Sequence, residues 1–281
     1  MFLGNSTYKF AEIKELVDKS KPLVHCLTNN IVINDTANII LAVGASPIMA
    51  ENPAEVFEIV SQADSLLINI GNINESRIES IFIAGLAAKQ SGVPIVFDPV
   101  GVACSKFRIE LAERIIHELQ PQIIKGNMSE IKKLALMESQ SRGVDVALCD
   151  TINSSTIEVN LHIVSKLAEK HNCTVVATGM HDLIANSTEQ YVLSNGSKLL
   201  ESVTGTGCIC GALISVYAST REYTAASLLA ISILNIAAEL AEHDVRRDNL
   251  GIGSFKIKLF DYISKITLDT INSRRKINWI K

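Results

Sequence analysis

The chain has 281 residues, of which 47% are hydrophobic and 20% are charged, and this balance excludes an intrinsically disordered protein. Its 26 basic and 30 acidic residues leave a formal net charge of −4, so no broad basic surface is expected and we expect no nucleic-acid partner. The length suits one α/β domain, although length alone does not exclude two smaller domains.

The predicted elements alternate between short apolar strands and longer helices. The N-terminal residues lack the basic and apolar regions of a secretory signal, and the first predicted strand begins at Leu23. Strands are predicted over residues 23–27, 66–70, 95–97, 123–124 and 174–177. Helices are predicted over residues 31–43, 54–62, 76–91, 107–119 and 128–136. This alternation is typical of a three-layer α/β/α fold, with a mostly parallel central sheet and helices on both faces.

The pattern changes in the last third of the chain. Two brief apolar runs at 183–185 and 191–193 predict a hairpin at one edge of the sheet. Three helices are expected to follow, over 208–218, 225–242 and 255–272, and then a polar tail. The most apolar window runs from Ala225 to Ala241, but polar residues interrupt it, so we predict a buried helix and no membrane partner.

The polar segment from Glu138 to Ser155 could be either a linker between two domains or a surface loop. Because strands and helices resume in the same style after it, we expect a surface loop and a single domain over residues 1–281. The six cysteines are scattered and do not resemble the disulfide framework of a small secreted protein. Together with the missing signal, this predicts a cytoplasmic protein.

A glycine-rich stretch at Val203-Thr-Gly-Thr-Gly-Cys directly precedes an apolar helical run. Free backbone N–H groups at the start of a helix can bind a phosphate. Glycines can equally serve a tight turn that requires a positive φ. The stretch alone does not distinguish the two interpretations, and neither a P-loop motif nor an early G-x-G-x-x-G motif is present.

Cys208 lies at the start of the same predicted helix, where the helix dipole is expected to lower the pKa of a thiol. The position allows a nucleophile, a proton acceptor or a small capping residue. No histidine forms a recognisable Cys-His pattern with Cys208, so covalent catalysis is the weaker interpretation.

Polar residues follow two of the predicted strands, at the edge where α/β sheets bind ligands. Asp98 ends the third strand, and we favour a binding role over an Asx turn. Asn127 and Glu130 follow the fourth strand at the spacing of a helix capping box. They could also hold a magnesium ion through water while Lys125 reaches a phosphate, and the capping and binding roles are compatible.

Met49 stands beside a turn near the start of the chain. Its spacing favours a position in the core. A thioether also adapts well to an apolar ligand pocket, so a binding role stays open.

Eight short motifs occur in one order along the chain: Thr28-Asn-Asn-Ile-Val, Ala45-Ser-Pro-Ile-Met, Asn69-Ile-Gly, Asp98-Pro-Val-Gly-Val, Lys125-Gly-Asn-x-Ser-Glu, Thr178-Gly, Val203-Thr-Gly-Thr-Gly-Cys and Asn235-Ile-Ala-Ala-Glu. Together they resemble the hydroxyethylthiazole kinases of the ribokinase-like superfamily, from about Pro22 to Phe260. The resemblance implies transfer of the γ-phosphoryl group of ATP, with Mg²⁺ as cofactor, to the hydroxyl of 4-methyl-5-(2-hydroxyethyl)thiazole in thiamine salvage. It also implies a homotrimer with active sites at the subunit interfaces.

Carried over position by position, the resemblance gives roles to individual residues. It assigns the thiazole to Met49 and Gly205, and ATP to Lys125 and Thr178. It assigns catalysis to Cys208, and an anion hole to Gly205, Thr206, Gly207 and Cys208. It assigns the magnesium ion to Asp98, Asn127 and Glu130, which would bind it partly through water.

The chain departs from the family pattern at three places. Lys125 stands where arginine is usual, and an ammonium group lacks the planar bidentate contact of a guanidinium group. Met180 replaces a charged residue, and Ala103-Cys104 occupy a place where Gly-Ala is common. These departures bear on ATP affinity. Two alternatives stay open: a kinase for another heterocyclic alcohol, such as hydroxymethylpyrimidine or pyridoxal, and a catalytically silent sensor of thiazole or nucleotide.

Overall fold

A computed structural model describes residues 5–139 and 156–280, and this part of the chain forms a nine-stranded sheet in the order β2-β1-β3-β4-β5-β6-β7-β8-β9. The strands are β1 (Leu23–Leu27), β2 (Ser46–Ile48), β3 (Ser65–Asn69), β4 (Ile95–Asp98), β5 (Ile123–Asn127), β6 (Thr174–Thr178), β7 (Asp182–Ala185), β8 (Gln190–Leu193) and β9 (Ile277–Trp279). Neighbouring strands are parallel from β2 to β6, and antiparallel from β6 to β9.

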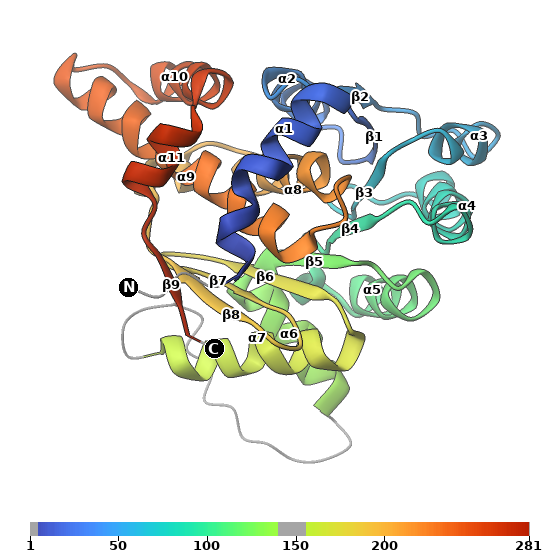
Figure 1. The fold of residues 1–281 in the computed structure, drawn as a ribbon. Coiled ribbons are helices and arrows are strands. Elements are labelled where there is room, and N and C mark those ends of the chain that lie inside the picture. The colour runs from blue at the N-terminus through green and yellow to red at the C-terminus, as the bar shows by residue number, and fades with distance from the viewer. Residues whose placement is uncertain (1–4, 140–155, 281) are drawn as a thin grey trace.

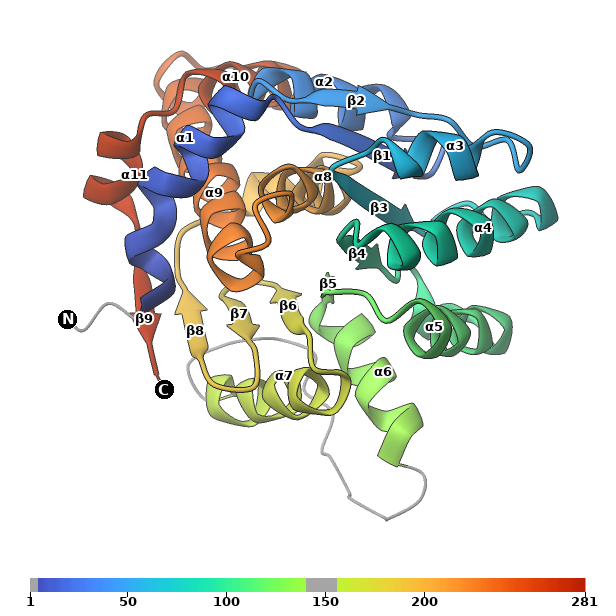
Figure 2. The same ribbon diagram turned by 45° about the vertical axis from the view of Figure 1, so that its right-hand side comes forward.

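Helices cover both faces of the sheet (Figures 1 and 2). One layer contains α1 (Phe10–Ser20), α2 (Ile33–Ala42), α8 (Thr206–Ala218), α9 (Tyr223–Arg247), α10 (Ile252–Lys265) and α11 (Leu268–Arg274). The other contains α3 (Val56–Ser61), α4 (Glu75–Ser91), α5 (Lys106–Leu119), α6 (Met128–Ser139) and α7 (Ile157–His171). Short 3₁₀ helices η1 (Asn5–Lys9), η2 (Val102–Cys104) and η3 (Lys198–Ser202) complete the described elements. The predicted three-layer α/β/α architecture is confirmed.

The strands are apolar on both faces because each face is covered by helices. In β4, Val96 belongs to the core beneath α8 and α9, whereas Ile95 and Phe97 belong to the core on the opposite face. Successive side chains of a strand point to opposite faces, so an unbroken apolar run serves two cores at once. The continuous Val and Ile runs of the sequence have this physical basis.

Several boundaries differ from the sequence-based predictions. The hairpin of β7 and β8 is confirmed, but β9 pairs outside β8, so the hairpin does not form the edge of the sheet. The helix predicted over 255–272 is two helices, α10 and α11, because Ile266 is extended and Thr267 caps α11 by accepting a hydrogen bond from the N–H of Thr270. The loop predicted between Glu138 and Ser155 lies largely outside the described residues.

Helix α9, which contains the long apolar window noted in the sequence, is buried as predicted. By length and composition alone it could cross a membrane, but 89% of its most apolar window lies inside the protein. It packs against α8 and α10. Its length and hydrophobicity therefore serve the core of this layer.

Candidate active site

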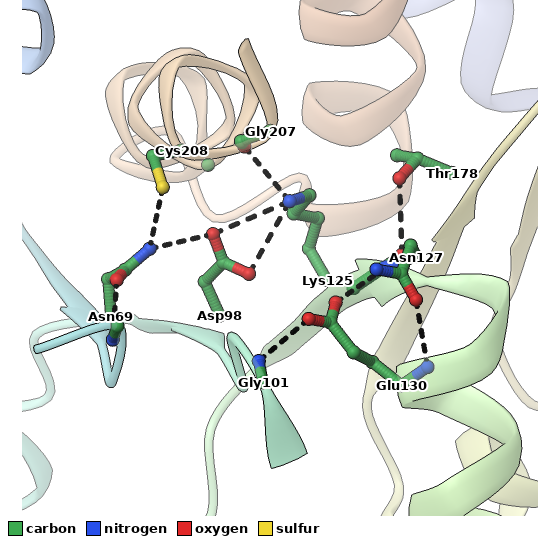
Figure 3. A network of polar contacts seen from close by, with 12 residues as sticks. Asn69, Asp98, Gly101, Lys125, Asn127, Glu130, Thr178, Gly207 and Cys208 are labelled. Atoms are coloured by element: carbon green, nitrogen blue, oxygen red, sulfur yellow. Dashed lines mark hydrogen bonds and ion pairs between the residues drawn. The ribbon is translucent and has the colours of Figure 1, made fainter. Parts of the chain in front are cut away.

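The polar residues predicted from separate strands meet where β3, β4 and β5 end, beneath the first turn of α8 (Figure 3). Asn69 and Asp98 pair in register at the ends of β3 and β4, and Asn127 pairs with Thr178 at the ends of β5 and β6. Parallel strands bring their carboxyl ends to one edge of the sheet, which places these side chains together. The network includes seven of the residues predicted to form a site: Asp98, Lys125, Asn127, Glu130, Thr178, Gly207 and Cys208.

Asp98 is fully buried at the centre of this network. One carboxylate oxygen accepts a hydrogen bond from the side-chain amide of Asn69 at 2.9 Å, and both face the ammonium of Lys125 at 3.4 Å. Burial raises the pKa of Asp98 to about 6, although Lys125 and Asn69 oppose the shift. Asp98 is thus a buried carboxyl group that changes charge near neutral pH.

Lys125 points inward from β5 and is also buried. Its Nζ donates a hydrogen bond to the carbonyl oxygen of Gly207 at 2.9 Å in addition to its contact with Asp98. Burial on its own would lower the pKa of the ammonium, but the surrounding acidic groups, first among them Asp98, outweigh it and hold the pKa above its ordinary value. Lys125 therefore stays charged.

Cys208 lies in the first turn of α8 with 8% of its surface exposed. Its Sγ accepts hydrogen bonds from the side-chain amides of Asn69 at 3.2 Å and Asn29 at 3.3 Å. Burial, followed by the negative charge of Asp98, raises the pKa of Cys208 above its ordinary value. The lowering expected from the helix N-terminus is therefore wrong, because burial and the neighbouring acid raise the pKa of this thiol.

The glycine-rich stretch forms the turn that starts α8. Gly205 has φ +90°, and a Cβ at this position would lie 2.3 Å from Cγ1 of Val32. Gly205 therefore meets the positive φ that the tight-turn interpretation requires. Gly205 precedes the helix and has no side chain, so it cannot cap the N–H groups of the first turn. An anion site requires such uncapped N–H groups.

Asn127 and Glu130 form the predicted capping box. Oδ1 of Asn127 accepts from the N–H of Glu130 at 2.9 Å, and a carboxylate oxygen of Glu130 accepts from the N–H of Asn127 at 2.8 Å. The other carboxylate oxygen accepts from the N–H of Gly101 at 2.8 Å and so ties the loop after β4 to α6. Helix capping is confirmed for both residues.

The Thr178 side chain lies at the far side of the network. Its hydroxyl is 3.4 Å from the carbonyl oxygen of Gly126, and the next residue, Gly179, donates its N–H to Asp182 at 3.1 Å. Asp182 is buried, and Asn235 of α9 donates to it at 2.6 Å. Burial raises the pKa of Asp182 to about 6. The role of Asp182 could not be predicted from the sequence, because nothing in its local pattern indicates that its carboxylate accepts a hydrogen bond from the Thr178-Gly179 turn.

Met49 lies apart from this network, in the loop after β2, and packs partly buried against the core beneath α8 and α9. The adjacent carbonyl of Ala50 is held by Nε2 of His25 at 2.8 Å. Since a carbonyl only accepts, Nε2 of His25 carries the hydrogen. The loop that presents Met49 is thus fixed by a buried imidazole of β1.

A cavity lies elsewhere in the described part of the chain. It measures about 770 Å³ and is lined by residues such as Asn172, Thr174, Asn186 and Glu189, at the start of β6 and the turn between β7 and β8. These positions are at the opposite end of β6 from Thr178. We assign the chemistry to the buried network because its charged side chains converge there, whereas none of the predicted site residues lines the cavity.

Comparison with known proteins identifies one group of relatives. A model of the hydroxyethylthiazole kinase family matches residues 13–269. A protein named hydroxyethylthiazole kinase 2 from Clostridium botulinum (strain Hall) is 42% identical over 267 residues, which cover 95% of this chain and 99% of that protein. Hydroxyethylthiazole kinase 1 from Methanosphaera stadtmanae is 38% identical over 274 residues, covering 95% of this chain and 96% of that protein.

Solved structures agree with the sequence relatives. The structure of a hydroxyethylthiazole kinase protein from Pyrococcus horikoshii OT3 has a TM-score of 0.87 and 32% identity, and covers 98% of this chain and 100% of that chain. A pyridoxal kinase from Staphylococcus aureus has a TM-score of 0.56 at 14% identity, covering 76% of this chain and 86% of its own, which shows a shared fold alone. A ribokinase-like superfamily protein from Enterococcus faecalis V583 has the same TM-score at 13% identity, covering 86% of each chain. The predicted ribokinase-like fold is confirmed.

Proposed function

This chain belongs to the hydroxyethylthiazole kinase family, and we propose from this membership that it transfers the γ-phosphoryl group of ATP to the hydroxyl of 4-methyl-5-(2-hydroxyethyl)thiazole. The product is a thiazole phosphate for thiamine salvage. The observation that carries the proposal is identity of 42% to a named thiazole kinase over nearly the full length of both chains. The buried charged network at the strand ends agrees with a reaction that depends on charge and geometry.

We propose that the thiolate of Cys208 accepts the proton of the substrate hydroxyl while the hydroxyl oxygen bonds to the γ-phosphorus of ATP and ADP leaves. Its sulfur already accepts two amide hydrogen bonds, which supports an acceptor role. Phosphoryl transfer passes through a loose transition state that asks little of a base, so a thiol can suffice. The thiazole is assigned to Met49 and Gly205, on the strength of the family resemblance.

We propose that the turn at Gly205, Thr206, Gly207 and Cys208 forms an anion hole for the transferred phosphoryl group. The missing side-chain cap at Gly205 supports this role, because it leaves N–H groups of the first turn of α8 available. Lys125 and Thr178 are assigned to ATP. Since Lys125 binds Asp98 and the Gly207 carbonyl, contact with a phosphate requires it to exchange one of these partners.

Magnesium is the proposed cofactor, and the residues present fit a hydrated ion. Among the described residues no three His, Cys, Asp or Glu side chains stand close enough to form a direct metal cage. The carboxylate of Glu130 and Oδ1 of Asn127 are engaged by backbone N–H groups, and Asp98 faces Lys125. Mg²⁺ commonly keeps several waters and binds through one or two carboxylates plus substrate phosphates. Asp98, Asn127 and Glu130 would hold such an ion through water, and the ion would neutralise charge on the phosphates.

A homotrimer with active sites at the subunit interfaces is part of the same proposal. Exposed apolar side chains support an interface near the site: Ile31 is 69% exposed, and Leu41 on α2 and Ile257 on α10 are 57% and 67% exposed. Ile31 lies in the same loop as Asn29, whose side-chain amide donates to Cys208. Light scattering in solution tests the assembly, which requires a mass three times the 30.5 kDa of one chain.

We also propose that residues 1–281 form one catalytic domain and that the protein works in the cytoplasm. The two helical layers share one sheet, which supports a single unit. The five cysteines within the described residues are free of disulfides, which suits a reducing compartment that supplies ATP.

Release of ADP by the purified chain tests the function. The assay contains ATP and magnesium with hydroxyethylthiazole, hydroxymethylpyrimidine, pyridoxal or no acceptor. We expect ADP release that depends on hydroxyethylthiazole, with the thiazole phosphate identified by mass. Turnover on another alcohol alone would replace the substrate, and thiazole binding without turnover on any acceptor would favour a sensor.

A further inference from the structure

Two asparagine side chains connect the thiol of Cys208 to Asp98. Nδ2 of Asn69 lies 2.9 Å from a carboxylate oxygen of Asp98 and 3.2 Å from Sγ of Cys208. Nδ2 of Asn29 lies 3.3 Å from the same sulfur and 3.1 Å from Oδ1 of Asn69. Asn69 is fully buried and Asn29 nearly so. The four side chains come from the ends of three elements, β3, β4 and α8, and from the loop after β1.

The orientation of both amides follows from their backbone partners. The N–H of Gly71 lies 3.0 Å from Oδ1 of Asn69, and the N–H of Ile31 lies 3.2 Å from Oδ1 of Asn29. A backbone N–H only donates, so the atom facing it is the amide oxygen in each case. Both amide nitrogens must therefore face the sulfur as donors.

Asn69 has all four of its hydrogen-bonding positions occupied. It donates to Asp98 and Cys208 and accepts from Gly71 and Asn29. Gly71 also makes room for this arrangement, because a Cβ there would lie 2.9 Å from Cβ and Nδ2 of Asn29. A buried amide with every partner in place holds its neighbours rigidly, since any displacement leaves a polar group unpaired.

We propose that Asn69 is a positioning residue for phosphoryl transfer, which holds the Cys208 sulfur and the Asp98 carboxylate at a fixed separation, with Asn29 as its support. This inference rests on the proposed function, in which both held groups serve the reaction. The two N–H donors on the sulfur favour its thiolate form, in which one of three lone pairs is left for the hydrogen of the substrate hydroxyl. Such preorganisation matters most where catalysis depends on geometry.

Two substitutions separate positioning from support of the loop. Asn69→Leu removes all four hydrogen bonds at similar volume, whereas Asn69→Asp keeps an oxygen for Gly71 and Asn29 but cannot donate as a carboxylate. We expect both to lower kcat by at least about 10-fold, with KM for the thiazole changed by less than about 3-fold. Asn160→Leu is the matched control, because Asn160 is a buried asparagine of α7 in the opposite helical layer, and it should leave kcat unchanged. An Asn69→Asp protein as active as the wild type would overturn the proposal.

A double-mutant cycle with Cys208→Ala gives a readout that a general structural defect would not move. If Asn69 acts partly through the thiol, the Cys208→Ala substitution lowers kcat by a smaller factor in the Asn69→Leu background than in the wild type. The expected coupling is at least about 5-fold in kcat, and fully additive effects would contradict the link to the thiol.

Alkylation of Cys208 by iodoacetamide at pH 8, followed by peptide mass spectrometry, tests the inference without activity. Loss of one of the two N–H donors on the sulfur disfavours the thiolate, so Asn69→Leu should slow alkylation by about 5-fold or more, whereas a loosened structure would accelerate it. The exposed Cys104 is the internal control in the same sample. Unchanged or faster alkylation would overturn the proposal. Slower alkylation in a chain that makes no thiazole phosphate would reject the proposed function and retain the role of Asn69 at the thiol.

Discussion

The ammonium of Lys125 lies 3.4 Å from both carboxylate oxygens of Asp98, in a place from which water is nearly excluded. Each side chain compensates the burial of the other, because an unpaired charge in this position would be costly. The same ammonium also binds the Gly207 carbonyl in the first turn of α8. The pair therefore joins β4 and β5 to the helix that carries Cys208.

The replacement Lys125→Arg tests whether an ammonium group at this position binds ATP more weakly than a guanidinium group does. Guanidinium groups bind phosphates through two parallel hydrogen bonds, so we expect the KM for ATP to fall by about 3- to 10-fold while the KM for the thiazole stays the same. Initial rates over a range of ATP concentrations measure this. An unchanged KM for ATP in a folded protein would contradict a direct phosphate contact, and Lys133→Arg on α6 is the control for a general effect of a Lys-to-Arg exchange.

The charge of Asp98 predicts opposite effects of pH on activity and on stability. Its pKa of about 6 in the folded chain exceeds the ordinary value of 3.8, so between these values the folded chain binds the proton more tightly than the unfolded chain. The contribution of Asp98 to the free energy of unfolding therefore rises as pH falls from about 6 to about 4. Activity, which requires the carboxylate, should fall below about pH 6.

Urea unfolding of the wild type and of Asp98→Asn at pH 7 and pH 5 checks the stability effect. We expect the difference in free energy of unfolding to move in favour of the wild type at the lower pH, by at most about 1.4 kcal/mol per pH unit. A difference that is constant, or that moves in favour of the variant, is the contrary result.

Removal of the Cys208 thiol should slow the reaction without abolishing it. For Cys208→Ala we expect kcat to fall by about 10- to 100-fold, because positioning and charge stabilisation stay in place. Cys208→Asp should be at least as active as Cys208→Ala, since Asn29 and Asn69 can donate to a carboxylate as they do to the sulfur. Complete loss of turnover in a correctly folded Cys208→Ala protein would contradict a modest role.

A methyl group at Gly205 should damage both stability and activity. The backbone there has φ +90°, and the added Cβ would lie 2.3 Å from Val32, so Gly205→Ala should lower the free energy of unfolding by about 2 kcal/mol or more. Gly253→Ala is the matched control, because Gly253 lies within α10 and a Cβ there meets nothing within 4 Å. The control should be neutral or stabilising by up to about 1 kcal/mol. Thermal unfolding of both variants shows whether the loss of stability is specific to position 205 or follows from any Gly-to-Ala exchange.

Features that depend on local chemistry could be predicted from the sequence. The capping box of Asn127 and Glu130 follows from their spacing, and the strands follow from Val and Ile runs buried on both faces. The break between α10 and α11 could not be predicted, because no glycine or proline occurs between Ile266 and Leu268. β9 was missed because three residues after a basic stretch have no pattern of their own and are ordered only by pairing with β8.

The candidate site likewise contains some residues that could be predicted from the sequence and others that could not. Asp98 was found because it ends an apolar strand, where ligands commonly bind. Asn29 and Asn69 stand in motifs of the family resemblance, but their role depends on a sulfur that comes from α8, far along the chain. The direction of the Cys208 pKa shift depends on burial and on Asp98, and neither is visible in the sequence around Cys208.

The pairing of β8 with β9 sets the order in which the sheet can be completed. Tyr191, Val192 and Leu193 face Trp279, Asn278 and Ile277, so the outer edge of β8 finds its partner only in residues that are synthesised about 85 positions later. During synthesis every parallel strand and all helices of both layers precede that segment. Until residues 277–279 leave the ribosome, β8 has a free edge with which other chains could pair. The three residues of β9 thus cover the edge of β8 at a late stage of synthesis.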